Sequence, residues 1–133
     1  MKNISYILII VLAIGCTQKR SVRVGSEKTD LRVLTIHELQ ENLESNHHKK
    51  IELQGYYYYA WETVGLFPNK RKNYEEAVWV TFSKQLRSEY STGLDEIIEG
   101  RKLRMQGVFD RTSRGHLGQY LGTITVDFIE TVD

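Results

Sequence analysis

The sequence has a single cysteine, almost no net charge and no apolar run long enough to cross a membrane. Cys16 is the only cysteine, so an internal disulfide framework is excluded. The chain has 18 basic and 17 acidic side chains, and removal of residues 1–15 takes away only Lys2, which leaves a formally neutral chain. Without a large positive excess, tight sequence-independent binding to nucleic acid is disfavoured. The apolar run from Tyr6 to Ile14 is shorter than the roughly 20 residues that a membrane-spanning helix needs.

The sequence also lacks the motifs of common catalytic and cofactor sites. It contains no Gly-x-Ser-x-Gly elbow, no phosphate-binding glycine loop and no paired carboxylate motif. Adjacent His47 and His48 would point to opposite sides of a strand, and no second cysteine accompanies them. We therefore expect no enzymatic activity, no cofactor and no metal site.

The first sixteen residues have the pattern of an export signal. Lys2 supplies a positive charge, an apolar run follows, and Gly15 places a small residue directly before Cys16. Residues 12–16, Leu-Ala-Ile-Gly-Cys, resemble the lipobox of bacterial lipoproteins, with Ala13 where that family more often has Leu. The resemblance implies that Cys16 becomes a lipid-modified N-terminus that anchors the protein to a membrane. The alternative is a secreted protein with an ordinary cleavage site and a free thiol.

We divide the chain into a lipoprotein signal peptide (1–15), the lipidated cysteine with a flexible linker (16–32) and one folded domain (33–133). The linker is polar, has no apolar periodicity and is basic near the membrane end. Thr17 follows the cysteine at the position where aspartate retains enteric lipoproteins at the inner membrane. The resemblance therefore implies an outer-membrane location, and the basic rather than acidic residues after Cys16 favour the periplasmic face.

The pattern of apolar residues predicts a mainly β domain with one short helix. Thr35 and Glu38 have the spacing of a capping box, and apolar residues at helical spacing predict a helix from Ile36 to Leu43. Alternation and β-branched runs then predict five strands. These strands cover residues 51–59, 61–66, 77–82, 103–109 and 119–130. Residues 83–100 are less regular and predict a short helix or turn packed under the sheet.

A local repeat links the first and fourth of these strands. Residues 49–57 match residues 101–109 position by position, each with basic residues, an apolar alternation and a Gln-Gly pair. A glycine in the middle of a strand marks a bulge or a sharp bend, so Gly55 and Gly107 predict two equivalent barrel corners.

Five strands with bends in the first and fourth, and an irregular segment before the fourth, resemble an OB-fold, a five-stranded Greek-key barrel. The order of glycine and aromatic positions is similar to that of small bacterial envelope lipoproteins with OB-like domains and no settled activity. The matching segments are 55–57, 77–80, 106–109 and 115–124. The resemblance implies the fold more than a function.

Candidate ligand-binding residues are aromatic side chains of the strands and basic side chains of the loop before the last strand. They are Tyr56, Tyr58, Trp61, Trp79, Arg111, Arg114 and His116. If Tyr57 shares the inward parity of Leu53, then Tyr56 and Tyr58 point outward, where aromatic faces can stack on a ligand. The other interpretation is that the tyrosines pack as core and rim. A second basic run at 70–72 follows the second strand, and we expect it to lie farther from the ligand-binding face than the loop before the last strand.

These observations predict a lipid-anchored binding module that holds a protein, peptide or glycan of the cell envelope. Two alternatives remain: a structural accessory subunit of an envelope complex, and a weak oligonucleotide-binding OB domain. The balanced charge argues against nucleic acid as the partner.

Overall fold

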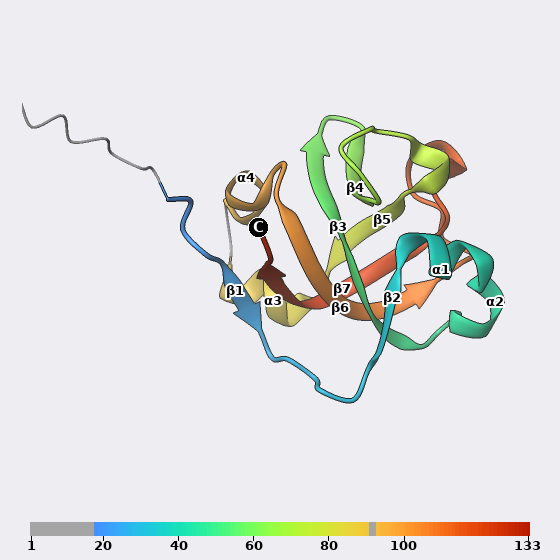
Figure 1. Ribbon diagram of the computed structural model, residues 1–133, viewed down its shortest axis with the longest axis horizontal. Coiled ribbons are helices and arrows are strands. Elements are labelled where there is room, and N and C mark those ends of the chain that lie inside the picture. Colours follow the sequence, from blue (N-terminus) through green and yellow to red (C-terminus); the bar gives the residue numbers. More distant parts are fainter. Residues whose placement is uncertain (1–17, 91–92) are drawn as a thin grey trace, which may run out of the picture.

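The structure is a computed structural model that describes residues 18–90 and 93–133 (Figure 1). The expected signal peptide and the lipid attachment site at Cys16 lie outside these residues. Within the described residues, no helix combines the length and apolar character needed to cross a bilayer.

Five strands form a closed barrel, which confirms the mainly β, OB-like fold. They are β3 (Lys50–Ala60), β4 (Thr63–Phe67), β5 (Val78–Phe82), β6 (Lys102–Asp110) and β7 (Thr123–Thr131). Around the barrel the order is β3, β4, β5, β7, β6 and back to β3. The β5–β7 pair is parallel, and the other four pairs are antiparallel. This is the strand order of an OB-like barrel, with β6 closing the sheet between β3 and β7.

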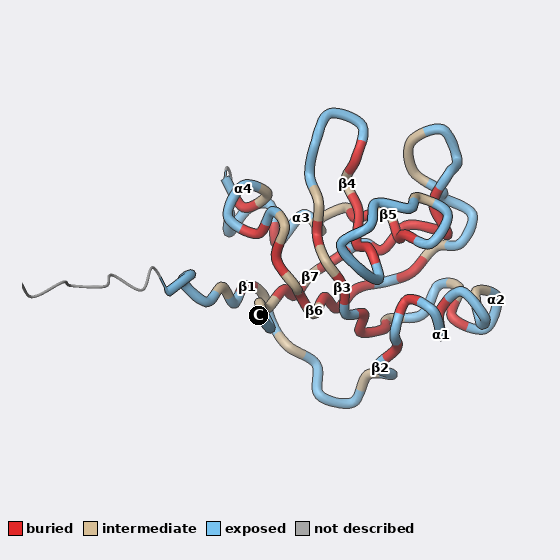
Figure 2. The backbone as a smooth tube through the Cα atoms, turned by 45° about the horizontal axis from the view of Figure 1, so that its top comes forward, coloured by how far each residue is buried: buried red, intermediate tan, exposed pale blue. Residues whose placement is uncertain are grey.

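The barrel interior is filled by side chains that alternate along each strand. Leu53 and Tyr57 of β3, Val78 and Val80 of β5, and Met105 of β6 are all buried in one apolar cluster. Figure 2 shows that buried and exposed stretches alternate along the barrel strands. These five side chains face the same side because side chains in a strand alternate between its two faces. One continuous cluster of buried apolar residues results, which stabilises the barrel without disulfides.

Short helices lie on opposite sides of the barrel (Figure 1). On one side are α1 (Ile36–Glu41) and α2 (Leu43–Asn46), and on the other are α3 (Lys84–Glu89) and α4 (Leu94–Ile98). The capping box is confirmed: the Thr35 hydroxyl accepts a hydrogen bond from the Glu38 N–H at 3.1 Å, and the Glu38 carboxylate accepts one from the Thr35 N–H at 2.7 Å. The helix ends two residues earlier than predicted, and α2 follows it directly.

The two repeat segments pair with each other as β3 and β6. Leu53 lies opposite Met105 at the centre, and the two glycines occupy equivalent places on either side, opposite Leu103 and Ile51. The repeat is therefore arranged about a local two-fold axis between the strands. A bulge at Gln106/Gly107 confirms one predicted bend. Gly55 keeps a regular register instead, and it is needed because a Cβ atom there would lie 2.6 Å from the Phe67 carbonyl oxygen.

Part of the predicted linker is folded onto the barrel, so the linker prediction for residues 16–32 is wrong in that part. The segment contains β1 (Arg23–Gly25), which pairs antiparallel with β7. β2 (Arg32–Thr35) pairs in parallel with β3, and its first residue also lies inside the predicted linker. Short strands with few apolar residues give no alternation in the sequence, and these strands depend on their partners for stability.

Two other strand boundaries also differ from the prediction. Trp61 lies in the turn between β3 and β4, so the second strand begins at Thr63. Residues 119–122 belong to a loop, which follows the single turn η2 (His116–Gly118), and β7 begins only at Thr123. Another single turn, η1 (Tyr74–Glu76), connects β4 to β5.

Candidate functional site

Five aromatic rings cover the outer face of β3, β4 and β5, which is where an OB-fold binds its ligands. We call Tyr58, Phe67, Tyr74, Trp79 and Tyr120 the aromatic layer. Their rings meet edge to face in a chain, with centroid distances of 5.6 Å, 5.9 Å, 5.6 Å and 5.0 Å from Tyr58 through to Trp79. Such pairs stabilise the fold beyond their area of contact. The face is therefore packed by the protein itself.

Side chains from two connecting segments cover part of this face. Tyr120 comes from the loop between β6 and β7 and Tyr74 from η1, and Tyr120 is fully buried. A Cβ atom at Gly65 would lie only 2.9 Å from the Tyr120 ring, so glycine in β4 makes room for that ring. Burial raises the pKa of the Tyr120 phenol to about 12. The Tyr120 ring that packs the β6–β7 loop against the sheet is therefore uncharged at neutral pH.

The outward orientation of Tyr56 and Tyr58 is confirmed. Both are half-buried, while Tyr57 between them is fully buried in the barrel. Lys70 lies over the Tyr56 ring with its Nζ 5.8 Å from the centroid, and Lys72 lies over Tyr58 at 4.6 Å. These are cation–π distances. The basic run at 70–72, which we expected to lie farther from the face, is the one that covers these two tyrosines.

The two tryptophans have different surroundings. Trp61 stands at the tip of the β3–β4 hairpin and is 94% exposed. Trp79 lies within the aromatic layer, against Tyr120 and the backbone of Gly115, where a Cβ atom would come within 2.7 Å of its ring. The tryptophans and the outward tyrosines therefore do not line one exposed groove.

The three basic candidates of the β6–β7 loop point to different partners. The guanidinium of Arg111 lies 2.5 Å from the Glu44 carboxylate on α2. Arg114 donates a hydrogen bond of 2.8 Å to the carbonyl of Tyr120 in its own loop. The ring of His116 lies 3.8 Å from the Glu62 carboxylate at the hairpin tip. The structure separates these residues, and each has a local partner.

A hollow that the sequence analysis missed has several positively charged side chains in its lining. Its volume is about 860 Å³, and its lining includes Lys19, Arg20, Lys70 and Lys102 with the outward ring of Tyr56. We call it the cationic hollow. None of the ion pairs among the described residues involves these four cationic side chains. The residues come from four distant segments, so no local pattern in the sequence could have identified the site.

One carboxylate also lines the cationic hollow, and it is already paired. Asp133 lies 2.6 Å from the guanidinium of Arg101, whose hydrogen bonds hold the pKa of the Asp133 carboxyl below its usual range. Arg101 is buried and also donates a hydrogen bond of 2.6 Å to the carbonyl of Arg20. This contact fixes the backbone of the residue that brings a cation to the hollow.

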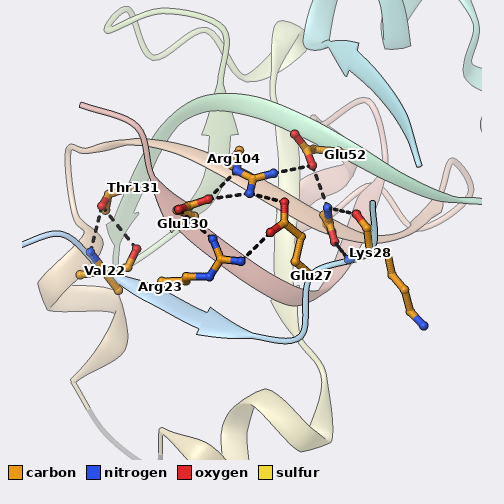
Figure 3. Close-up of polar contacts among 9 residues, drawn as sticks. Val22, Arg23, Glu27, Lys28, Glu52, Arg104, Glu130 and Thr131 are labelled. Carbon is orange, nitrogen blue, oxygen red and sulfur yellow. Dashed lines mark hydrogen bonds and ion pairs between the residues drawn. The ribbon is translucent and has the colours of Figure 1, made fainter. Parts of the chain in front are cut away.

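The outer face of β3, β6 and β7 is covered by a different device, a network of charges (Figure 3). Arg104 is central: its guanidinium contacts Glu27, lies 3.0 Å from Glu52 and lies 2.6 Å from Glu130. Arg23 of β1 contacts two of the same acids, at 2.5 Å for Glu27 and 3.0 Å for Glu130. We call these five residues the charged network.

The charged network joins the barrel to a segment that we call the strap, residues 22–28. Arg23 and Glu27 of the network belong to the strap. The buried Gln106 amide exchanges two hydrogen bonds of 2.8 Å with the backbone of Lys28. At the other end, the Val22 N–H donates to the Thr131 hydroxyl at 2.9 Å. Ion pairs and hydrogen bonds therefore fasten the strap at both ends, where the sequence predicted a flexible linker.

No protein-family model matches the chain, and no curated protein sequence matches it either. The class that the structure supports is a small, closed, OB-like β-barrel domain.

Proposed function

We propose that the chain is a lipid-anchored binding module of the bacterial cell envelope, held at the outer membrane through Cys16 and facing the periplasm. Its partner is a protein, peptide or glycan that presents acidic groups to the cationic hollow. The observation that carries this proposal is the convergence of four cationic side chains around one ring, with the nearby carboxylate already neutralised by Arg101. The export signal and the lipobox-like residues 12–16 support the location.

The hollow has the size and the groups that suit such a partner. Its volume of about 860 Å³ falls within the range of about 300–1,000 Å³ that is typical of ligand sites. The half-exposed Tyr56 ring offers an apolar face that can pack on a sugar ring or a side chain. Lysine and arginine side chains around it favour carboxylate or phosphate groups. A local patch of this kind is compatible with a chain that is neutral as a whole.

The strap places the hollow close to the proposed anchor. Because residues 22–28 are fastened to the barrel and the Arg20 carbonyl accepts a hydrogen bond from Arg101, only the short segment between Cys16 and Arg20 is left as a tether. An extended chain spans about 3.5 Å for each residue, which gives a reach of roughly 14 Å. Lys19 and Arg20, which line the hollow, belong to this segment. The module thus works close to the membrane surface.

Anchorage and partner binding are tested separately in the cells that make the protein. Metabolic labelling with palmitate is expected to label the wild-type protein and not the Cys16→Ser variant. For the partner, a photo-crosslinking amino acid is placed at position 56 in the full chain, and captured material is analysed by mass spectrometry. An unlabelled wild-type protein would contradict lipid anchoring at Cys16. The absence of any captured material would contradict the proposed binding role.

Charge reversal identifies the hollow as the capture site. The double variant Lys70→Glu, Lys102→Glu is expected to abolish the crosslink at position 56. A matched control, Lys49→Glu with Lys84→Glu, makes the same change in net charge at residues outside the lining and is expected to retain it. Equal capture by the two double variants would contradict a role of the hollow.

One observation favours a second function, a structural accessory subunit that stabilises an envelope complex. The face on which OB-folds stack bases or sugars is filled here by the aromatic layer. That face is therefore poorly suited to a small ligand, and the same observation disfavours the oligonucleotide-binding alternative. Capture of one stoichiometric protein by the crosslinker would favour the accessory role, and capture of glycan or peptide fragments would favour the binding module.

A further inference from the structure

Two adjacent histidines come together in the turn between α2 and β3. His47 ends α2 with extended backbone angles, and His48 follows in the left-handed region at φ 61°. A residue other than glycine rarely adopts this region, and here it interrupts the alternation of a strand. The two imidazole rings consequently lie on the same side, with centroids 3.7 Å apart. The expectation that they point in opposite directions holds for a strand and does not hold for this turn.

The turn is fastened to the end of β6, which brings a carboxylate to the histidines. The His48 N–H donates a hydrogen bond of 2.7 Å to the carbonyl of Phe109, and the next residue of β6 is Asp110. One ligand atom from each of His47, His48 and Asp110 lies within 4.8 Å of the other two. Among residues 18–90 and 93–133, this is the one group of three such side chains.

The distance between His47 and Asp110 suits a shared metal ion. The Nδ1 atom of His47 and the Oδ1 atom of Asp110 are 3.6 Å apart, which is too long for a hydrogen bond. Two donors that each lie about 2.0–2.1 Å from a tetrahedral ion stand roughly 3.4 Å from each other. The observed separation of 3.6 Å is close to this value.

The surroundings are compatible with a divalent cation. The N–H and the hydroxyl of Thr112 donate hydrogen bonds of 2.8 Å and 2.6 Å to the Oδ1 atom of Asp110, which fix the orientation of this carboxylate. The nearest arginine, Arg111, has its guanidinium on the Glu44 carboxylate at 2.5 Å, which offsets its positive charge. The Arg111 N–H donates to the Nδ1 atom of His47 at 3.2 Å, and coordination through that atom would replace this long hydrogen bond.

We propose that His47, His48 and Asp110 form a binding site for a divalent transition metal ion of the zinc type. Two imidazoles and one carboxylate are the donor set that zinc, nickel and copper accept, whereas calcium and magnesium prefer oxygen donors. The ring of His48 is exposed, so water completes the coordination. The bound ion links the α2–β3 turn to the end of β6.

Zinc chloride titrated into the full-length protein in detergent micelles, made without a histidine tag and stripped with a chelator, tests this site. Calorimetry is expected to show saturable binding of one ion. The His48→Asn variant removes an imidazole, and asparagine tolerates the left-handed backbone at this position. Loss of a metal ligand is expected to weaken binding by at least about tenfold, since loss of a hydrogen-bond partner outside the coordination shell already costs about 10–100-fold.

A matched control uses the histidine of α1. His37 is exposed and, among the described residues, forms an ion pair only with Glu41 in the next turn, at 3.4 Å, so His37→Asn is expected to bind zinc as the wild type does. Cobalt chloride gives an independent measurement, because visible absorption bands report its coordination by nitrogen donors. Absence of saturable binding in the wild type, or equal weakening in the two variants, would overturn the proposal.

Discussion

The two covered outer faces of the barrel are closed by different chemistry. On β3, β4 and β5, the aromatic layer packs two loops onto the sheet through rings that exclude water. On β3, β6 and β7, the charged network fastens the strap through two guanidinium groups and three carboxylates. Ring packing depends on buried area and ion pairing depends on solvent conditions. We therefore expect salt to weaken the charged network and to leave the aromatic layer unchanged.

Loss of a ring should have the largest effect on stability. Tyr120→Ala removes the side chain that touches Tyr74 and Trp79, and it leaves a cavity over Gly65. We expect the free energy of unfolding to fall by about 3–5 kcal/mol, as for other large-to-small changes at buried aromatic positions. Urea unfolding followed by fluorescence measures this loss. The control Trp61→Ala removes a ring that is 94% exposed and should change stability by no more than about 0.5 kcal/mol.

A loss below about 1 kcal/mol in Tyr120→Ala would mean that the β6–β7 loop contributes little to the closed face. In that case the loop would leave the outer face of β3, β4 and β5 readily, and this face would be available to bind a ligand as in other OB-folds. The stability measurement thus decides between a permanent cover and a removable one.

Loss of the central arginine should have a smaller effect, because its side chain is partly exposed. Arg104→Leu leaves Glu52 without its ion-pair partner and leaves Glu27 and Glu130 with Arg23 alone. The Arg104 side chain is 18% exposed in the wild type. We expect a loss of about 2–3 kcal/mol, in the range for a hydrogen-bonded charge left without its partner. The strap should also become sensitive to trypsin at Arg23 and Lys28.

Salt separates the two covers. High ionic strength should increase trypsin cleavage of the wild-type strap because screening weakens its ion pairs, and it should leave the stability contributed by Tyr120 unchanged. If cleavage is independent of salt, the backbone bonds of Val22 and Lys28 hold the strap, and the charged network contributes little.

The same comparison shows what the sequence could and could not predict. Strands with alternating apolar residues were predicted because their own side chains fill the barrel, as with Leu53 and Tyr57. The parity of β3 also predicted that Tyr56 and Tyr58 point outward. The sequence of the strap predicts a linker because the residues that stabilise the strap, Glu52, Arg104 and Glu130, lie far along the sequence.

The candidate site was harder to predict than the fold. The β-forming residues of segment 119–130 predict that Tyr120 belongs to the last strand, yet it lies in the loop before β7 and its ring covers the outer face of β3, β4 and β5. The cationic hollow joins residues from four segments, and the turn that aligns His47 with His48 depends on a backbone conformation that no residue pattern indicates. Local periodicity predicts which side of a strand a residue faces, but contacts between distant loops depend on the folded barrel.

Alkaline pH should loosen the aromatic layer. Burial raises the pKa of the Tyr120 phenol to about 12, whereas an exposed tyrosine in the unfolded chain titrates near 10. The folded state thus favours the neutral phenol, and this part of the stability is present below about pH 10 and lost as the pH rises toward 12. The buried Tyr120 hydroxyl has no hydrogen-bond partner among the described residues. Tyr120→Phe should therefore fold normally and show a shallower loss of stability between these pH values, as measured by urea unfolding.

Acid should release the strap, with the smallest effect on global stability. Hydrogen bonds from Arg104, and secondarily from Arg23, lower the pKa values of the Glu27 and Glu130 carboxyls. A lowered pKa favours the charged form in the folded state, so this contribution is present above the unfolded pKa and lost as the pH falls through the folded value. The protection of the β1 amides against hydrogen exchange, corrected for the intrinsic exchange rate at each pH, should fall on acidification while protection in β3 and β6 stays high, because the barrel interior contains no ion pair of this network. An equal fall in protection in all three strands would mean that strap and barrel open together, and the two covers would then belong to one cooperative unit.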